Sequence, residues 1–119
     1  WFDKELKRSF GIDVFATPYD HKQGYSVIEG NGVSLLVMRM EDMNRSLPQA
    51  LQAFLGLNAS AIEIQRANDG GAKWYADAID SVKNSFRVSG DQLERILSSR
   101  YMRHFYPNEV AGLRERWQA

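Results

Sequence analysis

Hydrophobic and polar positions along this chain follow two periods, one typical of strands and the other typical of helices. Strand-like runs at residues 25–29 and 33–40 lie on either side of Gly30-Asn31-Gly32. This arrangement predicts a β-hairpin, because asparagine and glycine both tolerate the positive φ angles of a tight turn. The second run is almost continuously apolar, so we expect a strand covered on both faces, whereas the first run is typical of an edge strand.

Apolar residues spaced three or four positions apart predict about five helices, beginning near residues 3, 46, 72, 89 and 107. Gly11 and Gly56 are suited to end the first and the second of these helices. The helical stripes and the second strand together predict a hydrophobic core. Its expected members are Leu36, Met38, Leu51, Phe54, Leu55, Ile79, Val82, Leu97 and Leu113. We therefore expect an α/β, mostly helical chain that forms a single domain over residues 1–119, with a short hairpin at about residues 25–40.

Two serine–glutamine pairs predict where two of the helices begin. Ser46 with Gln49, and Ser89 with Gln92, have the spacing of a capping box, in which each side chain satisfies a backbone N–H of the first turn. Pro48 would then lie in the first turn of the second helix, where its missing N–H costs little.

Composition narrows the class of function. Fifteen basic and fifteen acidic residues cancel, so no net field favours nucleic acid or an anionic membrane. The chain has no cysteine, which excludes disulfides and thiolate chemistry. Its two histidines lack ligand spacing, so we expect no metal site. No apolar run approaches the roughly 20 residues of a membrane span. Charges follow directly on Trp1-Phe2, unlike a signal peptide, and we expect a cytoplasmic protein.

Glu41 and Asp42 form an acidic pair at the end of the apolar strand run. Adjacent side chains on a strand point to opposite faces, so these two cannot face each other as general acid and base. We interpret them as structural, tying the strand end to neighbouring loops or capping the next turn, with catalysis as the alternative. His21 could be a general base, because histidine as a residue type suits that role near neutral pH, but a solvated loop histidine is the simpler interpretation. The residues therefore identify no catalytic group.

The segment from Arg100 to Tyr106 combines cations with aromatic rings. Arg100, Arg103, His104 and Tyr106 could bind a sugar, a phosphate or a sulfate through forked donors and ring stacking. The alternative is a helix end whose rings pack inward while its cations face water and the negative end of the helix dipole.

A second polar segment spans residues 66–75. The glycine pair Gly70-Gly71 precedes a predicted helix and has Lys73 nearby, so it could seat a phosphate or a sulfate, although a plain turn is the simpler interpretation. Trp74 could be a sugar platform or a packing residue. Arg66 is the other cation of this segment.

Several short motifs occur in an order that resembles the C-terminal half of the sulfotransferase fold. Residues 37–56 contain an apolar strand, then Glu41-Asp42, then Pro48 in the next helix, and Phe54-Leu55-Gly56 at its close. Other motifs resemble a bacterial branch of that superfamily, the capsular polysaccharide synthesis proteins. They are Trp1-Phe2-Asp3 with Glu5, residues 10–14, Gly24-Tyr25, Asn68, Lys73-Trp74-Tyr75, and Phe105-Tyr106 with Glu109. The resemblance covers nearly the whole chain.

The resemblance implies transfer of a sulfuryl group from 3′-phosphoadenosine 5′-phosphosulfate to a hydroxyl of a saccharide acceptor. It also implies that Arg66 and Lys73 lie near the 3′-phosphate of this donor. In such enzymes a glycine-containing loop near the N-terminus holds the 5′-phosphosulfate, and this sequence has no such loop. We therefore expect a fragment whose phosphate-binding half, of P-loop type, lies upstream of Trp1, and no cofactor bound by this chain alone.

Two further hypotheses belong to other classes of function. A non-catalytic helical domain could bind a partner protein or a glycan through Trp74, Tyr101 and Tyr106. A self-contained enzyme of another class is disfavoured, because no nucleophile lies at useful spacing from a base. We also expect a homodimer through the exposed strand edge, since a lone apolar hairpin favours another strand beside it.

Overall fold

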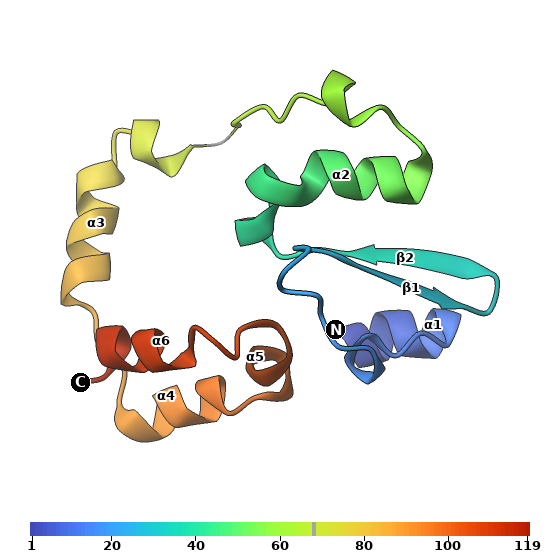
Figure 1. Cartoon of the computed structure of the whole chain (residues 1–119). Helices are drawn as coiled ribbons and strands as arrows, with labels where there is room; N and C mark the ends of the chain where they lie inside the picture. The colour runs from blue at the N-terminus through green and yellow to red at the C-terminus, as the bar shows by residue number, and fades with distance from the viewer. Residues whose placement is uncertain (68) are drawn as a thin grey trace. The chain divides into compact units, whose positions relative to one another are not determined.

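The computed structural model describes residues 1–67 and 69–119, which are mostly helical and contain one antiparallel pair of strands (Figure 1). The predicted combination of a hairpin with several helices is therefore confirmed. The chain divides into two compact units, Trp1–Ile64 and Gln65–Ala119. Asn68, one of the motif residues, lies outside the described residues.

The first unit contains the hairpin and two helices. A π-helical segment, Phe2–Lys7, continues into α1 (Arg8–Phe10), and a single turn follows at Val14–Ala16. Strands β1 (Ser26–Gly30) and β2 (Val33–Val37) come next, then a 3₁₀ turn at Met40–Asp42 and helix α2 (Met43–Leu55). A last turn spans Ala59–Ala61. In Figure 1 the two strands run between α1 and α2.

The predicted Asn-Gly hairpin is confirmed in detail. Gly30 pairs with Val33, and the two loop residues have positive φ angles, 49° at Asn31 and 74° at Gly32. The Asn31 side chain also donates a 2.9 Å hydrogen bond to the carbonyl of Phe10, which ties the turn to the end of α1. The turn therefore sets both the strand register and the position of the first helix.

The two strands differ from the prediction in how they are covered. In β1, buried and exposed residues alternate from Ser26 to Glu29, as expected for an edge strand. Residues 35–37 of β2 are half-buried, so the expected strand covered on both faces is wrong. Among the described residues β2 pairs with β1 alone, which leaves its other edge without a strand.

Helix α2 begins earlier than its sequence motif predicts. It starts at Met43, with Asp42 at the N-cap position, so the capping box from Ser46 to Gln49 is wrong. The chain is already helical in the 3₁₀ turn at Met40–Asp42, so α2 can begin directly after this turn. Ser46 and Pro48 therefore lie inside the helix. Gly56 ends α2 as predicted, with a φ angle of 70°.

Small residues, rather than large ones, form the buried face of α2. Ser46 and Ala50, one helical turn apart, are almost fully buried. Leu51 and Phe54 are only half-buried and Leu55 is 59% exposed, so their predicted place in the core is wrong. Because Ser46 and Ala50 are small, the backbone of α2 can lie close to the neighbouring segments. The large side chains of α2 then lie at the edge of the packed face. The apolar residues actually buried in this unit are Ile12, Val14, Tyr19, Ile28 and Ala50.

The second unit contains four α-helices: α3 (Ala76–Ser85), α4 (Gly90–Leu97), α5 (Arg100–Phe105) and α6 (Val110–Trp117). Ser89 lies at the N-cap of α4 as predicted, and its hydroxyl bonds the Gln92 side chain at 3.0 Å rather than a backbone N–H. The predicted fourth helix breaks at Ser99, whose hydroxyl accepts the N–H of Met102 and starts α5. Six α-helices are therefore described instead of about five.

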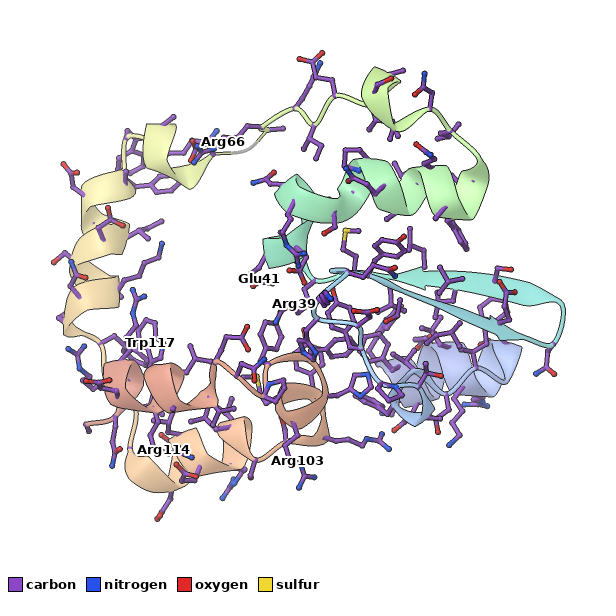
Figure 2. The ribbon with its side chains drawn as sticks, in the orientation of Figure 1. Arg39, Glu41, Arg66, Arg103, Arg114 and Trp117 are labelled. Atoms are coloured by element: carbon purple, nitrogen blue, oxygen red, sulfur yellow. The ribbon has the colours of Figure 1, made fainter. Side chains whose placement is uncertain are left out.

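The buried residues of the second unit are Leu93, Leu97 and Phe105. Val82 is 60% exposed and Ile79 is exposed too, so their predicted core positions on α3 are wrong; α3 packs mainly against the turn at Gly70–Ala72. Figure 2 shows Arg114 of α6 reaching toward α4, where it makes two hydrogen bonds with Glu94. An apolar groove of about 390 Å³ is lined from α4, α5 and α6, and Leu113 contributes to its wall. None of the described helices is long and apolar enough to cross a bilayer.

Candidate functional site

Asp42 is the centre of a buried polar cluster in the first unit. Its side chain accepts hydrogen bonds from Arg39 Nε at 2.7 Å and from Arg45 Nη2 at 2.8 Å. The Tyr19 hydroxyl lies 2.8 Å from the Asp42 carboxylate, which is part of a residue only 4% exposed. Buried carboxylates are tolerated when they are paired and hydrogen-bonded in this way. Arg39, Asp42 and Arg45 are spaced three apart around the 3₁₀ turn, so local geometry brings the three together.

The electrostatics of this cluster fix its protonation state. The hydrogen bond from the Arg39 guanidinium holds the pKa of Asp42 well below its usual range, against the opposing effect of burial, and Arg45 and Tyr19 act in the same direction. Burial raises the pKa of Tyr19, so its phenol stays protonated. The hydrogen bonds of Asp42 agree with its structural interpretation, in which it ties the end of the strand to a neighbouring loop.

The cluster fastens the loop before β1 to the start of α2. The single proton of the Tyr19 hydroxyl serves both Asp42 and the carbonyl of Gly24, which lies 2.7 Å away. Arg45 donates to the carbonyls of Lys22, at 2.9 Å, and of His21, at 3.3 Å. These bonds hold the turn at residues 21–24 against the start of α2.

Gly24 lies close to the side chains of Ser46 and Arg45 on α2. Its φ angle is 83°, and a Cβ placed there would overlap the Ser46 hydroxyl and lie 2.7 Å from Arg45 Nη2. Only glycine combines this backbone conformation with so little space.

The structure places the other predicted acid–base candidates around this cluster without joining them into a pair. Glu41 is exposed beside the buried Asp42, and Figure 2 shows it next to Arg39 at the end of β2. The half-buried His21 ring meets the Tyr19 ring edge-on, with centroids 5.0 Å apart. A facing carboxylate pair, or a nucleophile with its base, is not formed by these residues.

In the second unit, Asp69 organises the turn that contains the glycine pair. Its carboxylate accepts the N–H of Gly71 at 2.9 Å and forms an ion pair with Arg66, also at 2.9 Å. The turn donor that could hold a phosphate or sulfate is thus already used by a carboxylate of the chain. The simpler interpretation of Gly70-Gly71, a turn before a helix, is confirmed. Lys73 follows the turn and is exposed.

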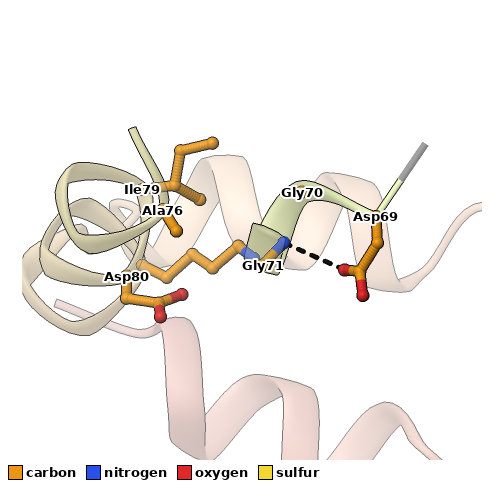
Figure 3. Close-up of a pocket in the computed structure, with 7 residues that line it drawn as sticks. Asp69, Gly70, Gly71, Ala76, Ile79 and Asp80 are labelled. Carbon is orange, nitrogen blue, oxygen red and sulfur yellow. Dashed lines mark hydrogen bonds between the residues drawn. The ribbon is translucent and has the colours of Figure 1, made fainter. Parts of the chain in front are cut away.

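A hollow of about 230 Å³ lies between this turn and α3 (Figure 3). Its lining combines two carboxylates, one ammonium group and several small or apolar residues. These residues are Asp69, Gly70, Gly71, Ala76, Ile79, Asp80 and Lys83. Figure 3 shows Asp69 and Asp80 on opposite sides of Gly71. The sequence motifs did not point to Asp80 or Lys83.

Trp74 links the turn to α3 and is 94% exposed. Its ring meets that of Tyr75 edge-on, with centroids 5.4 Å apart. Tyr75 therefore contacts the Trp74 ring edge-on, and the two faces of the Trp74 ring remain open to solvent. Its role as a saccharide platform stays a prediction.

The other predicted saccharide residues lie on or next to α5. Arg100 and Arg103 are exposed, and Arg103 points away from the helix in Figure 2. His104 is half-buried, and its ring meets the buried Phe105 ring edge-on at 4.6 Å. The rings of Tyr101 and Tyr106 lie 5.8 Å apart. The structure thus gathers cations and aromatic rings on one short helix, while their binding of a saccharide remains a prediction.

Comparison with known proteins connects most of the chain to one family. A protein-family model named NKWYS, "Putative capsular polysaccharide synthesis protein", matches residues 1–107. No curated protein and no solved structure shows a significant match. The matched range includes the hairpin, the Asp42 cluster, the hollow beside Gly71 and all of α5. The chain therefore belongs to the family of capsular polysaccharide synthesis proteins that this model describes.

Proposed function

We propose that this chain is the C-terminal portion of a sulfotransferase-like protein that acts in capsular polysaccharide modification. The protein would transfer a sulfuryl group from 3′-phosphoadenosine 5′-phosphosulfate to a saccharide hydroxyl. The family description supports the saccharide context. One observation carries the proposal: β2 leads through Glu41 and Asp42 directly into α2, which ends at Gly56. This is the order of strand, acidic pair and helix that the sulfotransferase resemblance implies.

In this proposal the chain contributes support and contacts rather than the reacting groups. The Asp42 cluster holds the strand-to-helix connection rigid, and the 5′-phosphosulfate would be bound by residues upstream of Trp1. Arg66 and Lys73 would meet the 3′-phosphate, with Arg66 exchanging its exposed ion pair to Asp69 for the phosphate. The saccharide would contact Trp74 and the α5 residues Arg100, Arg103, His104 and Tyr106.

The test compares two versions of the protein. Calorimetry on the present chain should show no saturable binding of the phosphosulfate donor or of its bisphosphate product. The protein extended by the residues encoded upstream should bind the donor and transfer radiolabelled sulfate to capsular saccharide. Tight donor binding by the present chain would overturn the assignment of the donor site to an upstream segment, and an extended protein without transfer would overturn the activity.

A pair of variants in the extended protein tests the donor contacts. Lys73→Ala should weaken donor binding about tenfold, as expected for loss of a charge-assisted contact to phosphate. Lys4→Ala, at another exposed lysine, is the control and should leave donor binding unchanged. Equal affinities of the Lys73→Ala and Lys4→Ala variants for the donor would show that Lys73 does not contact the donor.

A second candidate function is a non-catalytic domain that binds a glycan or a partner protein. The exposure of Trp74 and the open apolar groove beside α6 favour it, because large exposed apolar surfaces commonly mark binding sites. Saccharide binding without sulfate transfer in the extended protein would select this candidate.

A further inference from the structure

We propose that the hollow beside Gly71 binds one uncharged sugar unit of the acceptor saccharide. The identity of the ligand as a saccharide rests on the proposed function. The choice of an uncharged unit, and of this place on the chain, rests on the lining of the hollow.

The size and composition of the hollow suit a single sugar ring. A hollow of about 230 Å³ is smaller than the sites that enclose drug-sized ligands, which suits a single ring rather than a nucleotide. Ala76 and Ile79 supply an apolar wall against which the C–H groups of a sugar ring can pack. The two glycines opposite add no side chain, so the backbone of the turn borders the ligand directly.

The polar side chains of the lining have the hydrogen-bonding capacity that sugar hydroxyls need. An ionised carboxylate offers about four acceptor positions. Asp69 uses part of this capacity on the Gly71 N–H and on Arg66, and it keeps lone pairs for sugar hydroxyls. Asp80 adds a second carboxylate from α3, and Lys83 adds a donor one helical turn later. Hydroxyl groups, which both donate and accept, match this mixture of acceptors and a donor.

The carboxylates of the lining favour a neutral ligand over an anion. Asp69 and Asp80 line the hollow together with the ammonium group of Lys83, and Arg66, which forms an ion pair with Asp69, is not among the lining residues. A carboxylate, phosphate or sulfate placed between Asp69 and Asp80 would meet carboxylate oxygens at close range, whereas a neutral hydroxyl can donate hydrogen bonds to them.

Trp74 provides a place for the neighbouring sugar unit. It lies in the chain between the turn and α3, the two elements that line the hollow, and its ring faces are open. Stacking of sugar C–H groups on such a ring would extend the site beyond one unit.

The test is a nuclear magnetic resonance titration of the full 119-residue chain labelled with ¹⁵N. Maltotriose and cellotriose are the neutral probes, and trigalacturonate is the anionic probe of equal length. At least one neutral probe should shift the amides of Gly70, Gly71 and Ile79 in a saturable way. Trigalacturonate should bind roughly fivefold more weakly or worse, the effect of about one unit-charge contact in water.

Three variants sharpen the test. Asp80→Asn keeps the side-chain volume and an acceptor but removes a charge, so it should bring the affinity for trigalacturonate close to that for the neutral probe. Asp77→Asn is the matched control, an exposed carboxylate on the same helix outside the lining, and should change neither affinity. Ala76→Leu should fill the hollow and abolish the shifts, with an unchanged spectrum elsewhere showing that the chain is folded.

Equal or tighter binding of trigalacturonate, or no saturable neutral binding at these amides, would overturn the inference. Its failure is separable from that of the proposed function. Neutral binding without sulfate transfer rejects only the transferase activity. Transfer whose KM for the acceptor is unchanged in Ala76→Leu rejects only the sugar site.

Discussion

The hydroxyl of Tyr19 lies 2.8 Å from the carboxylate of Asp42, although 23 positions separate the two residues in the sequence. The contact joins the loop that precedes the hairpin to the start of the helix that follows it. Both strands of the hairpin therefore lie, in the sequence, between Tyr19 and Asp42. Because Tyr19 and Asp42 are both buried, loss of either partner leaves a polar group without water to replace it.

Tyr19→Phe should lower the free energy of unfolding by about 1–3 kcal/mol, the cost of leaving a buried acceptor unsatisfied. Urea denaturation followed by circular dichroism measures the change. Tyr25→Phe, at a half-buried tyrosine nearby, is the matched control and should cost less. Equal stability of the two variants would show that the Tyr19 hydroxyl adds nothing to the fold.

Acid should destabilise the chain through Asp42. The folded state lowers the pKa of this carboxyl below its ordinary value of 3.8, so its ionisation stabilises the fold above that pH. This contribution declines as the pH falls from 3.8 toward the folded-state pKa. The pH dependence of urea denaturation should therefore be shallower in Asp42→Asn, which is also less stable at neutral pH by about 3 kcal/mol. An identical pH dependence in the variant would contradict this account.

Adjacent residues on α4 should differ sharply in their contribution to stability. Leu97 is 3% exposed and Ile96 is 55% exposed. Leu97→Ala should cost about 2–5 kcal/mol, as truncation of buried leucines does, while Ile96→Ala should cost less than about 1 kcal/mol. Thermal or urea unfolding of the two variants gives the comparison, and a reversed order would mean that the buried face of α4 is misplaced.

Asn31 should stabilise the first unit in two separable ways. Asn31→Gly keeps the positive φ angle but removes the hydrogen bond to the Phe10 carbonyl, at a cost of about 0.5–1.5 kcal/mol. Asn31→Ala also introduces about 1–2 kcal/mol of backbone strain. Unfolding free energies should therefore rank the native chain first, then glycine, then alanine. Equal values for the two variants would mean that the turn tolerates alanine without strain.

The open edge of the hairpin should promote self-association. A two-stranded sheet leaves backbone groups available for another strand, so light scattering at high concentration should give a mass rising above 13.6 kDa. Val27→Lys on β1 should reduce the association, since charge on an edge strand opposes pairing. Leu57→Lys, at an exposed position outside the sheet, serves as the control. A mass of one chain at every concentration would exclude this dimer.

Local signals in the sequence were sufficient for the hairpin and for the glycines that end α1 and α2, because turn residues act over a few positions. Asn31-Gly32 and Gly56 adopt the positive φ angles that their types predict. The apolar stripes were less informative. They do not show that α2 is buried through Ser46 and Ala50, since close backbone packing depends on which segment lies opposite.

The Asp42 cluster could have been found in part. Arg39, Asp42 and Arg45 are spaced three apart, and that spacing predicts contact on a helical turn. Tyr19 and the Gly24 carbonyl carry no such signal, because long-range packing brings them there. The hollow beside Gly71 was hidden for the same reason: Asp80 and Lys83 become its lining only when α3 packs on the turn.

The narrow space at Gly24 has a consequence for how the family can vary. A comprehensive substitution screen should divide the glycines of this chain into two groups. At Gly24, every replacement has to displace Ser46 or Arg45, so the screen should recover glycine alone. At Gly112, within α6, a Cβ meets no atom within 4 Å, and alanine there should improve the helix. Intolerance at a glycine thus reports a positive φ angle, as at Gly56, and at Gly24 it also reports a loop held against a helix, even in a relative whose structure is unknown.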